Sequence, residues 1–179
     1  INILFANGAT GTIANEGIID GSLTNTASST IKTFNTGSIS GSIINNADAT
    51  IETLNVDSNV GSIANSGEIN SLTIQNGSNI ANGITNAGDI TTLIASGNVT
   101  NGITNAGNIT TLTNNQANTN ITNNQNIGTL DIKANTTYAG AGSITNALDI
   151  DGAQTQFTIS DGAGGNGTLT LAENANTAN

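Results

Sequence analysis

The sequence predicts an all-β protein, a single-stranded right-handed parallel β-helix (β-solenoid) with three short strands in each coil. The first observation behind this prediction is a repeated phrase, since residues 82–93 return as residues 101–112 with only Asp89 replaced by Asn108. The second is a set of aliphatic columns with a period of about 20 residues, and the third is strand-like alternation within each phrase. A fixed period of this length is typical of solenoids, whose repeats stack on one another.

Aliphatic residues recur in four columns, which we expect to be buried ladders. The first column advances by 20, 20, 21, 19, 18 and 23 residues, so that a coil has about 18–23 residues, along Leu23, Ile43, Ile63, Ile84, Ile103, Ile121 and Ile144. The second contains Ile31, Ile51, Ile69, Ile90, Ile109, Ile127 and Ile150, and the third Phe34, Leu54, Leu72, Leu93, Leu112 and Leu130. A looser fourth contains Ile39, Val60, Ile80 and Val99. Such variable coils favour the right-handed form over the left-handed hexapeptide form, whose aliphatic residues recur about every six positions.

Within a phrase, small and apolar residues occupy every second position, as in Ile103, Asn105, Gly107 and Ile109. This is the two-residue period of a β-strand. A helical solenoid is disfavoured because Gly, Asn and Thr are poor residues for helix interiors. Disorder is disfavoured because a polar low-complexity chain without a core would not keep its aliphatic residues in regular columns.

An asparagine lies between the first and second aliphatic columns of every repeat. Its members are Asn25, Asn45, Asn65, Asn86, Asn105, Asn123 and Asn146. Stacked amides at equivalent corners can hydrogen-bond along the rod, and asparagine tolerates the left-handed backbone of tight corners. We therefore predict a structural role for this column, with ligand contact as the alternative.

The chain is predicted to form one β-helix domain over residues 1–179. Residues 1–20 form the opening coil, residues 21–132 the regular coils, and residues 133–179 the irregular C-terminal coils and a loop. Neither end resembles a sealing cap, and open ends of a β-stack can pair with further strands. We therefore expect this chain to be a fragment of a longer one.

Two irregular segments are the candidates for binding. Residues 135–142 are predicted to be an insertion and residues 162–167 a flexible loop. Loops held on a rigid scaffold often carry the contacts of a protein. The candidate binding residues are therefore Thr136, Thr137, Tyr138 and Asn166.

The charged residues are mostly acidic, with 12 Asp and Glu against 2 Lys and a formal net charge of −10. This balance argues against nucleic acid as a partner, because phosphates require a basic face, and against an anionic membrane surface. No run of about twenty apolar residues is present, so we predict no transmembrane segment. The chain begins at Ile1 without the pattern of a signal peptide, and we expect such a peptide to have been removed. The lack of Cys is compatible with export.

Catalysis is poorly supported by the available residue types. The chain has no His and no Cys, and its two basic residues are Lys32 and Lys133, so a Ser–His pair, a thiolate or an arginine clamp cannot form. The acidic residues are dispersed along the sequence. We predict that the chain is not an enzyme, with a glycan-hydrolysing pair of carboxylates as the alternative.

We predict no cofactor, with calcium as the alternative. Residues 164–169 have the glycines of a calcium-binding nonapeptide but lack its aspartate, and Asp149, Asp151 and Asp161 could offer carboxylates. Ice binding would require two outward ranks of hydroxyl groups on one face. Only one such column recurs, namely Thr33, Thr53, Ser71, Thr92, Thr111 and Thr129, so ice binding is disfavoured.

The pattern Gly-x-Ile-x-Asn-x-Gly-x-Ile-x-x-Leu, as in residues 61–72, resembles the repeats of bacterial autotransporter (type V secretion) passenger domains. The similarity covers residues 10–150 and is greatest to the vacuolating-cytotoxin-like group and adhesin-type β-helices. The resemblance implies a right-handed β-helix that is exported across the outer membrane by a C-terminal β-barrel in the rest of its chain. No functional residue can be transferred, because the shared positions are those of the structural ladder.

These observations together predict a non-catalytic secreted β-helix at the bacterial cell surface. Its expected role is that of an adhesin, a self-associating protein or a scaffold for a virulence factor. The expected partners are a host-cell or matrix surface, or a second copy of the chain. The alternative is an assembly subunit of a surface layer or a filament.

Overall fold

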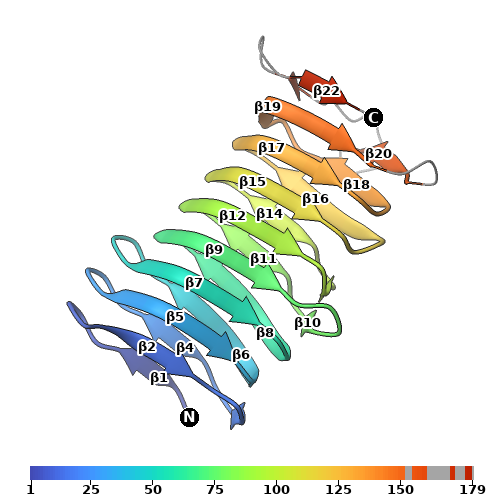
Figure 1. Cartoon of the computed structure of the whole chain (residues 1–179). Helices are drawn as coiled ribbons and strands as arrows, with labels where there is room; N and C mark the ends of the chain where they lie inside the picture. The colour runs from blue at the N-terminus through green and yellow to red at the C-terminus, as the bar shows by residue number, and fades with distance from the viewer. Residues whose placement is uncertain (152–154, 161–169, 172–175, 179) are drawn as a thin grey trace.

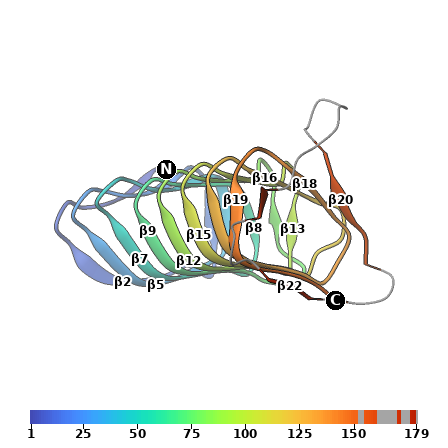
Figure 2. The same ribbon diagram turned by 90° about the horizontal axis from the view of Figure 1, so that it is seen from above.

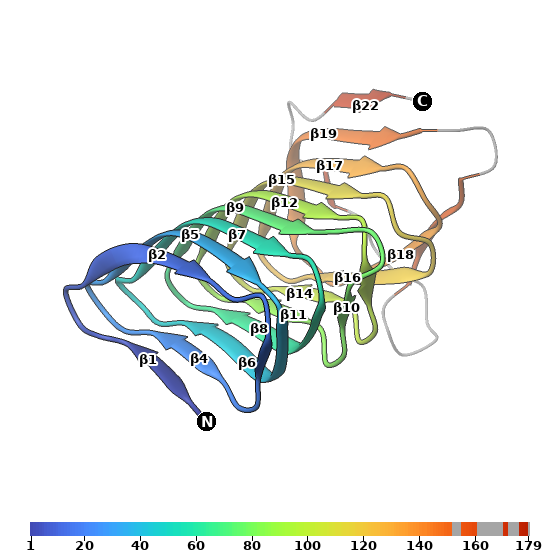
Figure 3. The ribbon, with the colours of Figure 1, turned by 60° about the horizontal axis from the view of Figure 1, so that its bottom comes forward.

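The computed structural model describes residues 1–151, 155–160, 170–171 and 176–178. These residues form an all-β parallel solenoid of about eight coils with about 20 residues per coil, and they contain no helix (Figure 1). The predicted fold class is confirmed. The rod consists of two parallel sheets that face each other as opposite walls (Figure 3), and the coils follow one another along its axis (Figure 2).

The first wall is a 12-stranded sheet, here called sheet A. Its strands are β1 (Ile3–Phe5), β3 (Ile18–Ile19), β4 (Leu23–Asn25), β6 (Ser38–Asn45), β8 (Asn59–Asn65), β10 (Asn79–Ile80), β11 (Ile84–Asn86), β13 (Asn98–Val99), β14 (Ile103–Asn105), β16 (Thr119–Asn123), β18 (Thr136–Ala139) and β20 (Phe157–Ile159). The second wall is a 10-stranded sheet, here called sheet B. Its strands are β2 (Thr10–Ala14), β5 (Thr30–Thr36), β7 (Thr50–Val56), β9 (Glu68–Ile74), β12 (Asp89–Ala95), β15 (Asn108–Asn114), β17 (Asn126–Ile132), β19 (Ser143–Ile150), β21 (Thr170–Leu171) and β22 (Asn176–Ala178).

The parallel register confirms the predicted aliphatic columns over the regular coils. Ile84 pairs with Ile103 in the first column, and Leu93 pairs with Leu112 in the third. A buried aliphatic side chain contributes about 1.5–3 kcal/mol to folding, so the columns together form the core. The predicted ladder residues are at most 1% exposed, namely Ile43, Ile63, Leu72, Ile84, Leu93, Ile103, Leu112 and Ile121.

The asparagine column is a continuous chain of hydrogen bonds inside the rod. From Asn25 to Asn123, each side-chain Nδ2 donates to the Oδ1 of the next asparagine at 2.8 Å. The Nδ2 groups also donate to backbone carbonyls, and that of Asn105 lies 3.0 Å from Gly107 O and 2.9 Å from Asn126 O. The predicted stacking is confirmed, and the buried members are Asn25, Asn45, Asn65, Asn86, Asn105 and Asn123.

The corner after each ladder asparagine brings successive coils into close contact. Gly88 and Gly107 lie two residues after Asn86 and Asn105. A Cβ atom on Gly107 would lie 2.1 Å from the carbonyl oxygen of Gly88, which is far inside contact distance. Because the obstacle is backbone, no side chain can move to relieve it. At Gly107 glycine is therefore required for the close stacking on the preceding coil, whereas the equivalent position after Asn123 is Gln125.

Each regular strand of sheet B bends once in its middle. In β5 the buried residues Ile31 and Phe34 are three positions apart, and the exposed Lys32 lies between them. The strand pairing skips the position of Lys32 and resumes at Thr33. The two-residue period therefore holds on either side of the bend and not across it. The equivalent positions in later coils are Glu52, Asn70, Thr91, Thr110 and Gly128.

The prediction of three short strands per coil holds for only some of the coils. Residues 79–80 and 98–99 form separate short strands, β10 and β13, before β11 and β14. In β6 and β8 the equivalent segment is continuous with the strand of sheet A. In the described part of the chain, the coils formed by β16 with β17 and by β18 with β19 have two strands each.

A further buried ladder at the end of the sheet B strands was not predicted. Its members pair in register from coil to coil and are 0% exposed. Their side chains differ in type, which hides the column in the sequence. They are Thr36, Val56, Ile74, Ala95, Asn114 and Ile132.

The predicted register is wrong after Ile132. Tyr138, and not Ile144, pairs with Ile121 in the first column, while Ile144 pairs with Ile127 in the second. Ile150, predicted in the second column, pairs with Ile132 instead. Asn146 is exposed and does not extend the asparagine ladder. The physical reason is that residues 133–142 form a short coil whose tyrosine fills the core, so no insertion is present.

Candidate functional site

The segment predicted to be an exposed insertion is a strand of the solenoid. Strand β18 pairs with β16 on one side and with β20 on the other. Thr136 is 3% exposed and Tyr138 is 0% exposed, whereas Thr137 is half-buried. The expectation that Thr136 and Tyr138 lie on an exposed binding loop is therefore wrong. Asn166, the fourth candidate, lies outside the described residues.

Tyr138 ends the asparagine ladder inside the core. Asn123 Nδ2 donates to the Oη of Tyr138 at 2.9 Å. The ring of Tyr138 lies against that of Phe157, with 5.7 Å between the centroids. Burial raises the pKa of Tyr138, and the hydrogen bond from Asn123 partly offsets this effect. Tyr138 therefore packs in the core of the C-terminal coils and stabilises them.

We expect Tyr138 to increase the sensitivity of the fold to alkaline pH. Burial keeps the folded phenol neutral above its ordinary pKa of 10.0, whereas the unfolded phenol ionises there. The stability that depends on this difference is complete below about pH 10 and is lost as the pH rises through the folded pKa. Thermal melting of Tyr138→Phe should therefore fall less steeply above about pH 10 than that of the wild type. Parallel melting curves of the two proteins would contradict this prediction. The titration of Lys133 does not affect the comparison, because both proteins contain this residue.

Acidic residues that are dispersed in the sequence gather at two corners of the solenoid. A hollow of about 400 Å³ at the entrance to sheet B is lined by Asp48, Glu68 and Asp89, and the last two pair in register. A second hollow of about 510 Å³ at the exit from sheet B is lined by residues that include Glu16 and Asp57. Like charges on adjacent strands repel each other. The corners are thus negatively charged surfaces that the sequence pattern did not reveal.

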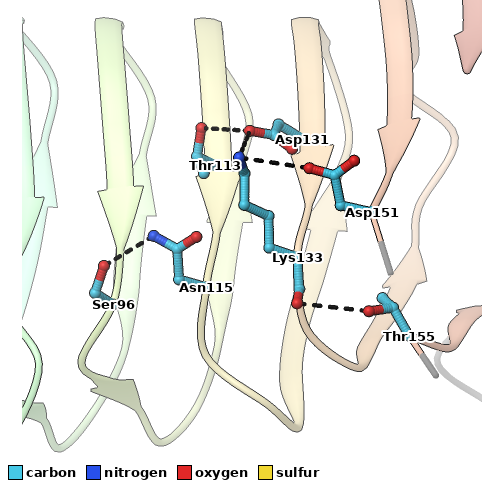
Figure 4. A network of polar contacts seen from close by, with 7 residues as sticks. All are labelled: Ser96, Thr113, Asn115, Asp131, Lys133, Asp151 and Thr155. Atoms are coloured by element: carbon cyan, nitrogen blue, oxygen red, sulfur yellow. Dashed lines mark hydrogen bonds and ion pairs between the residues drawn. The ribbon is translucent and has the colours of Figure 1, made fainter. Parts of the chain in front are cut away.

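A third group of charges lies on the outer side of sheet B near the C-terminal coils (Figure 4). One oxygen each of Asp131, Asp149 and Asp151 lies within 4.8 Å of the others. Lys133 Nζ lies 3.4 Å from Asp131 Oδ2 and 3.5 Å from Asp151 Oδ2, and Thr113 Oγ1 donates to Asp131 Oδ2 at 3.3 Å. The negative charge of Asp131 is the main cause of the raised pKa of Lys133.

In this cluster the ammonium group of Lys133 already acts as the cation beside two of the carboxylates. Calcium requires about six to eight oxygen ligands. The cluster offers three carboxylates, and the ammonium group of Lys133 lies beside two of them. The arrangement is therefore an ion-pair network. Asp161 and residues 164–169, which belong to the calcium prediction, lie outside the described residues.

We expect Lys133→Met to lower the melting temperature at neutral pH. Without the ammonium group, the carboxylates of Asp131, Asp149 and Asp151 repel one another. At high salt concentration this repulsion is screened, and the difference in melting temperature should shrink. Lys32→Met is the matched control, because Lys32 is exposed and forms none of the ion pairs of the described residues. A loss that persists undiminished at high salt would show that the methylene chain, and not the charge, matters.

The two sheets differ sharply in charge. The strands of sheet A contain no charged residue. The strands of sheet B contain Lys32, Glu52, Glu68, Asp89, Asp131 and Asp149. Sequence analysis missed this division, although a signal was present. Within the repeats, charges follow the asparagine column and are absent from segments such as residues 59–65, 79–86 and 98–105.

Comparison with known proteins assigns no family to this chain. The chain matches no protein-family model, no curated protein and no solved structure at a significant level. In the described part of the chain, no helix is long and apolar enough to cross a membrane.

Proposed function

We propose that this chain is a non-catalytic β-helix scaffold at the bacterial cell surface, exported across the outer membrane as part of a longer passenger. Its proposed role is to hold adhesive surfaces away from the cell. The observation that carries the proposal is the continuous parallel pairing from β1 to β20 in one sheet and from β2 to β19 in the other. Such pairing supports a stiff rod with equivalent side chains displayed at every coil.

A repeated surface suits adhesion for a physical reason. Neighbouring coils lie about 4.8 Å apart, so about eight coils form a rod of roughly 40 Å. Each coil displays small polar side chains such as Thr85 and Thr104, which pair in register. Individually weak contacts gain strength when several form at once on a rigid support. A host-cell or matrix surface with a repeated structure is therefore a suitable partner.

Binding of the purified protein to host cells and to matrix proteins tests this proposal. The matched control is Ile103→Asp, which places a charge in the core and keeps the surface composition. We expect the wild type to bind in a saturable manner and the control to lose binding together with its fold. Absence of saturable binding on a broad panel of cells and matrix proteins would overturn the adhesive role.

The alternative role is that of an assembly subunit in a surface layer or filament. The first coil favours it, because its core residues Ile3, Phe5 and Ile13 are only partly buried, and β1 and β2 each pair with a strand on one side only. A further coil, from the same chain or from another copy, would cover these groups. Filaments in electron micrographs that lengthen with protein concentration would support this alternative over the adhesin.

The non-catalytic part of the proposal has its own test. Glu68 and Asp89 lie at one hollow on neighbouring coils, and paired carboxylates can hydrolyse glycosides. We expect no product from a panel of common glycans. Turnover that is lost in both Glu68→Gln and Asp89→Asn would show that the chain is an enzyme.

A further inference from the structure

We propose that the outer face of sheet A is a docking surface for a second copy of this chain, with the two rods side by side. We call this surface the neutral face. It consists of the residues that point outward between buried neighbours in sheet A, one from each coil, namely Leu4, Thr24, Ile44, Ala64, Thr85, Thr104 and Thr122. The inference goes beyond the proposed adhesive role, because it assigns self-association to a particular surface.

Charge is the first argument for the neutral face. The whole chain has a net charge of −10, so two copies repel each other in most orientations. The strands of sheet A contain no charged residue, and the carboxylate of Asp20 lies beside this sheet, where it accepts a hydrogen bond from Ser40 of β6. The charged strand residues lie on sheet B, the opposite wall. Contact through the neutral face therefore places the charged strands of the two copies on the far sides of the pair.

Distance strengthens this argument. Sheets that pack face to face lie about 10 Å apart, so the charges of sheet B lie at least that far behind the neutral face. At physiological ionic strength the screening length is about 8 Å. When two neutral faces meet, the charged walls of the two rods are separated by several screening lengths. Their remaining repulsion is therefore small.

The side chains of the neutral face suit close contact. Most of them are small, the exceptions being Leu4 and Ile44, and they are aligned, since Thr85 pairs with Thr104 and Thr104 with Thr122. Beside them the hydroxyl groups of Ser42 and Ser62 lie 2.7 Å apart. This edge of the face is therefore ordered by its own hydrogen bond. Short side chains lose little conformational entropy when they are covered. The face can therefore meet a matching flat surface at low entropic cost.

The area is sufficient for a specific dimer. Seven coils at a spacing of about 4.8 Å and strands of about five residues give roughly 500 Å² on each partner. The total of about 1,000 Å² reaches the lower limit of specific interfaces. A two-fold axis through the face would let each copy use the same residues, as in most homodimers.

A second copy fits this face better than other partners do. A basic partner would be attracted to the corners that contain Asp48, Glu68 and Asp89, and not to sheet A. An acidic partner would be repelled by the rod as a whole. A neutral, flat surface of the same spacing is the best match, and every copy of the chain carries one.

Paired lysine substitutions test the proposal by analytical ultracentrifugation. Thr85→Lys with Thr104→Lys changes the neutral face, and Thr92→Lys with Thr111→Lys is the matched control on sheet B in the same coils, where both pairs are in register. Each double variant reduces the net charge from −10 to −8 (−10 + 2 = −8). Non-specific repulsion would therefore weaken in both, which favours association. A buried neutral face predicts instead that only the first variant raises the dimer dissociation constant, by about tenfold or more.

Several results would overturn the proposal. The wild type would stay monomeric at high concentration, or the two double variants would associate equally, or small-angle scattering would show a dimer of twice the rod length. The last result would indicate end-to-end assembly. If both double lysine variants have lowered melting temperatures, the single variants Ala64→Ser and Ala64→Lys are compared instead, because each changes only one position of the neutral face. Adhesion of the monomeric variant to cells is measured separately, so failure of the dimer and failure of the adhesive function remain distinguishable.

Discussion

Replacing Ile103 by aspartate is expected to unfold the middle of the rod at neutral pH. Ile103 is 1% exposed and pairs with Ile84 and Ile121 in the first ladder. The substitution loses about 2–3 kcal/mol of apolar burial. It also places an unpaired carboxylate in the core, which costs several kcal/mol more. The sum is comparable to the total stability of a typical domain, about 5–15 kcal/mol.

The matched control is Thr104→Asp, which adds the same charge to the same coil at an outward position. Hydrogen exchange should show lost protection in the strands around β14 for Ile103→Asp, and nearly unchanged protection for Thr104→Asp. In a solenoid each coil contacts only its neighbours, so the loss should spread outward from this coil. Equal melting temperatures of the two variants would contradict the ladder.

Replacing Asn105 by alanine is expected to have the next largest effect, a loss of about 2–4 kcal/mol in the free energy of unfolding. Asn105 Nδ2 donates to Asn123 Oδ1, Gly107 O and Asn126 O, and its Oδ1 accepts a hydrogen bond from Asn86. Alanine removes all of these hydrogen bonds at once and creates a small cavity. Denaturant unfolding measures the loss.

Asn55→Ala is the matched control for the ladder asparagine. Asn55 Nδ2 also donates to a stacked asparagine, Asn35 Oδ1, at 2.8 Å, but this pair is exposed to water. We expect a change below about 0.5 kcal/mol. Asn146→Ala should likewise have little effect, because Asn146 is exposed. If the loss for Asn105→Ala is no greater than for these variants, the buried ladder does not contribute as proposed.

The candidate sites show where a sequence pattern is insufficient. The expected binding segment around Tyr138 was selected because its spacing departed from the repeat. In the structure the same segment is a core strand. The acidic clusters, in contrast, were not predicted although they lie on the surface. Asp131 and Asp149 are far apart in the sequence but pair in register. A correct register for the C-terminal coils would have placed them side by side.

The sequence by itself determined the parallel solenoid, the aliphatic columns and the asparagine ladder, because repeats of nearly equal length place identical residues at identical positions. Only the tertiary structure decided the register beyond Ile132. There the sequence offered Ile144 for the first column, whereas the fold uses Tyr138. The physical reason is that burying the tyrosine ring against Phe157, with its hydroxyl group on Asn123, satisfies the end of the amide ladder. Such a fit depends on shape and hydrogen bonding in three dimensions, which periodicity does not record.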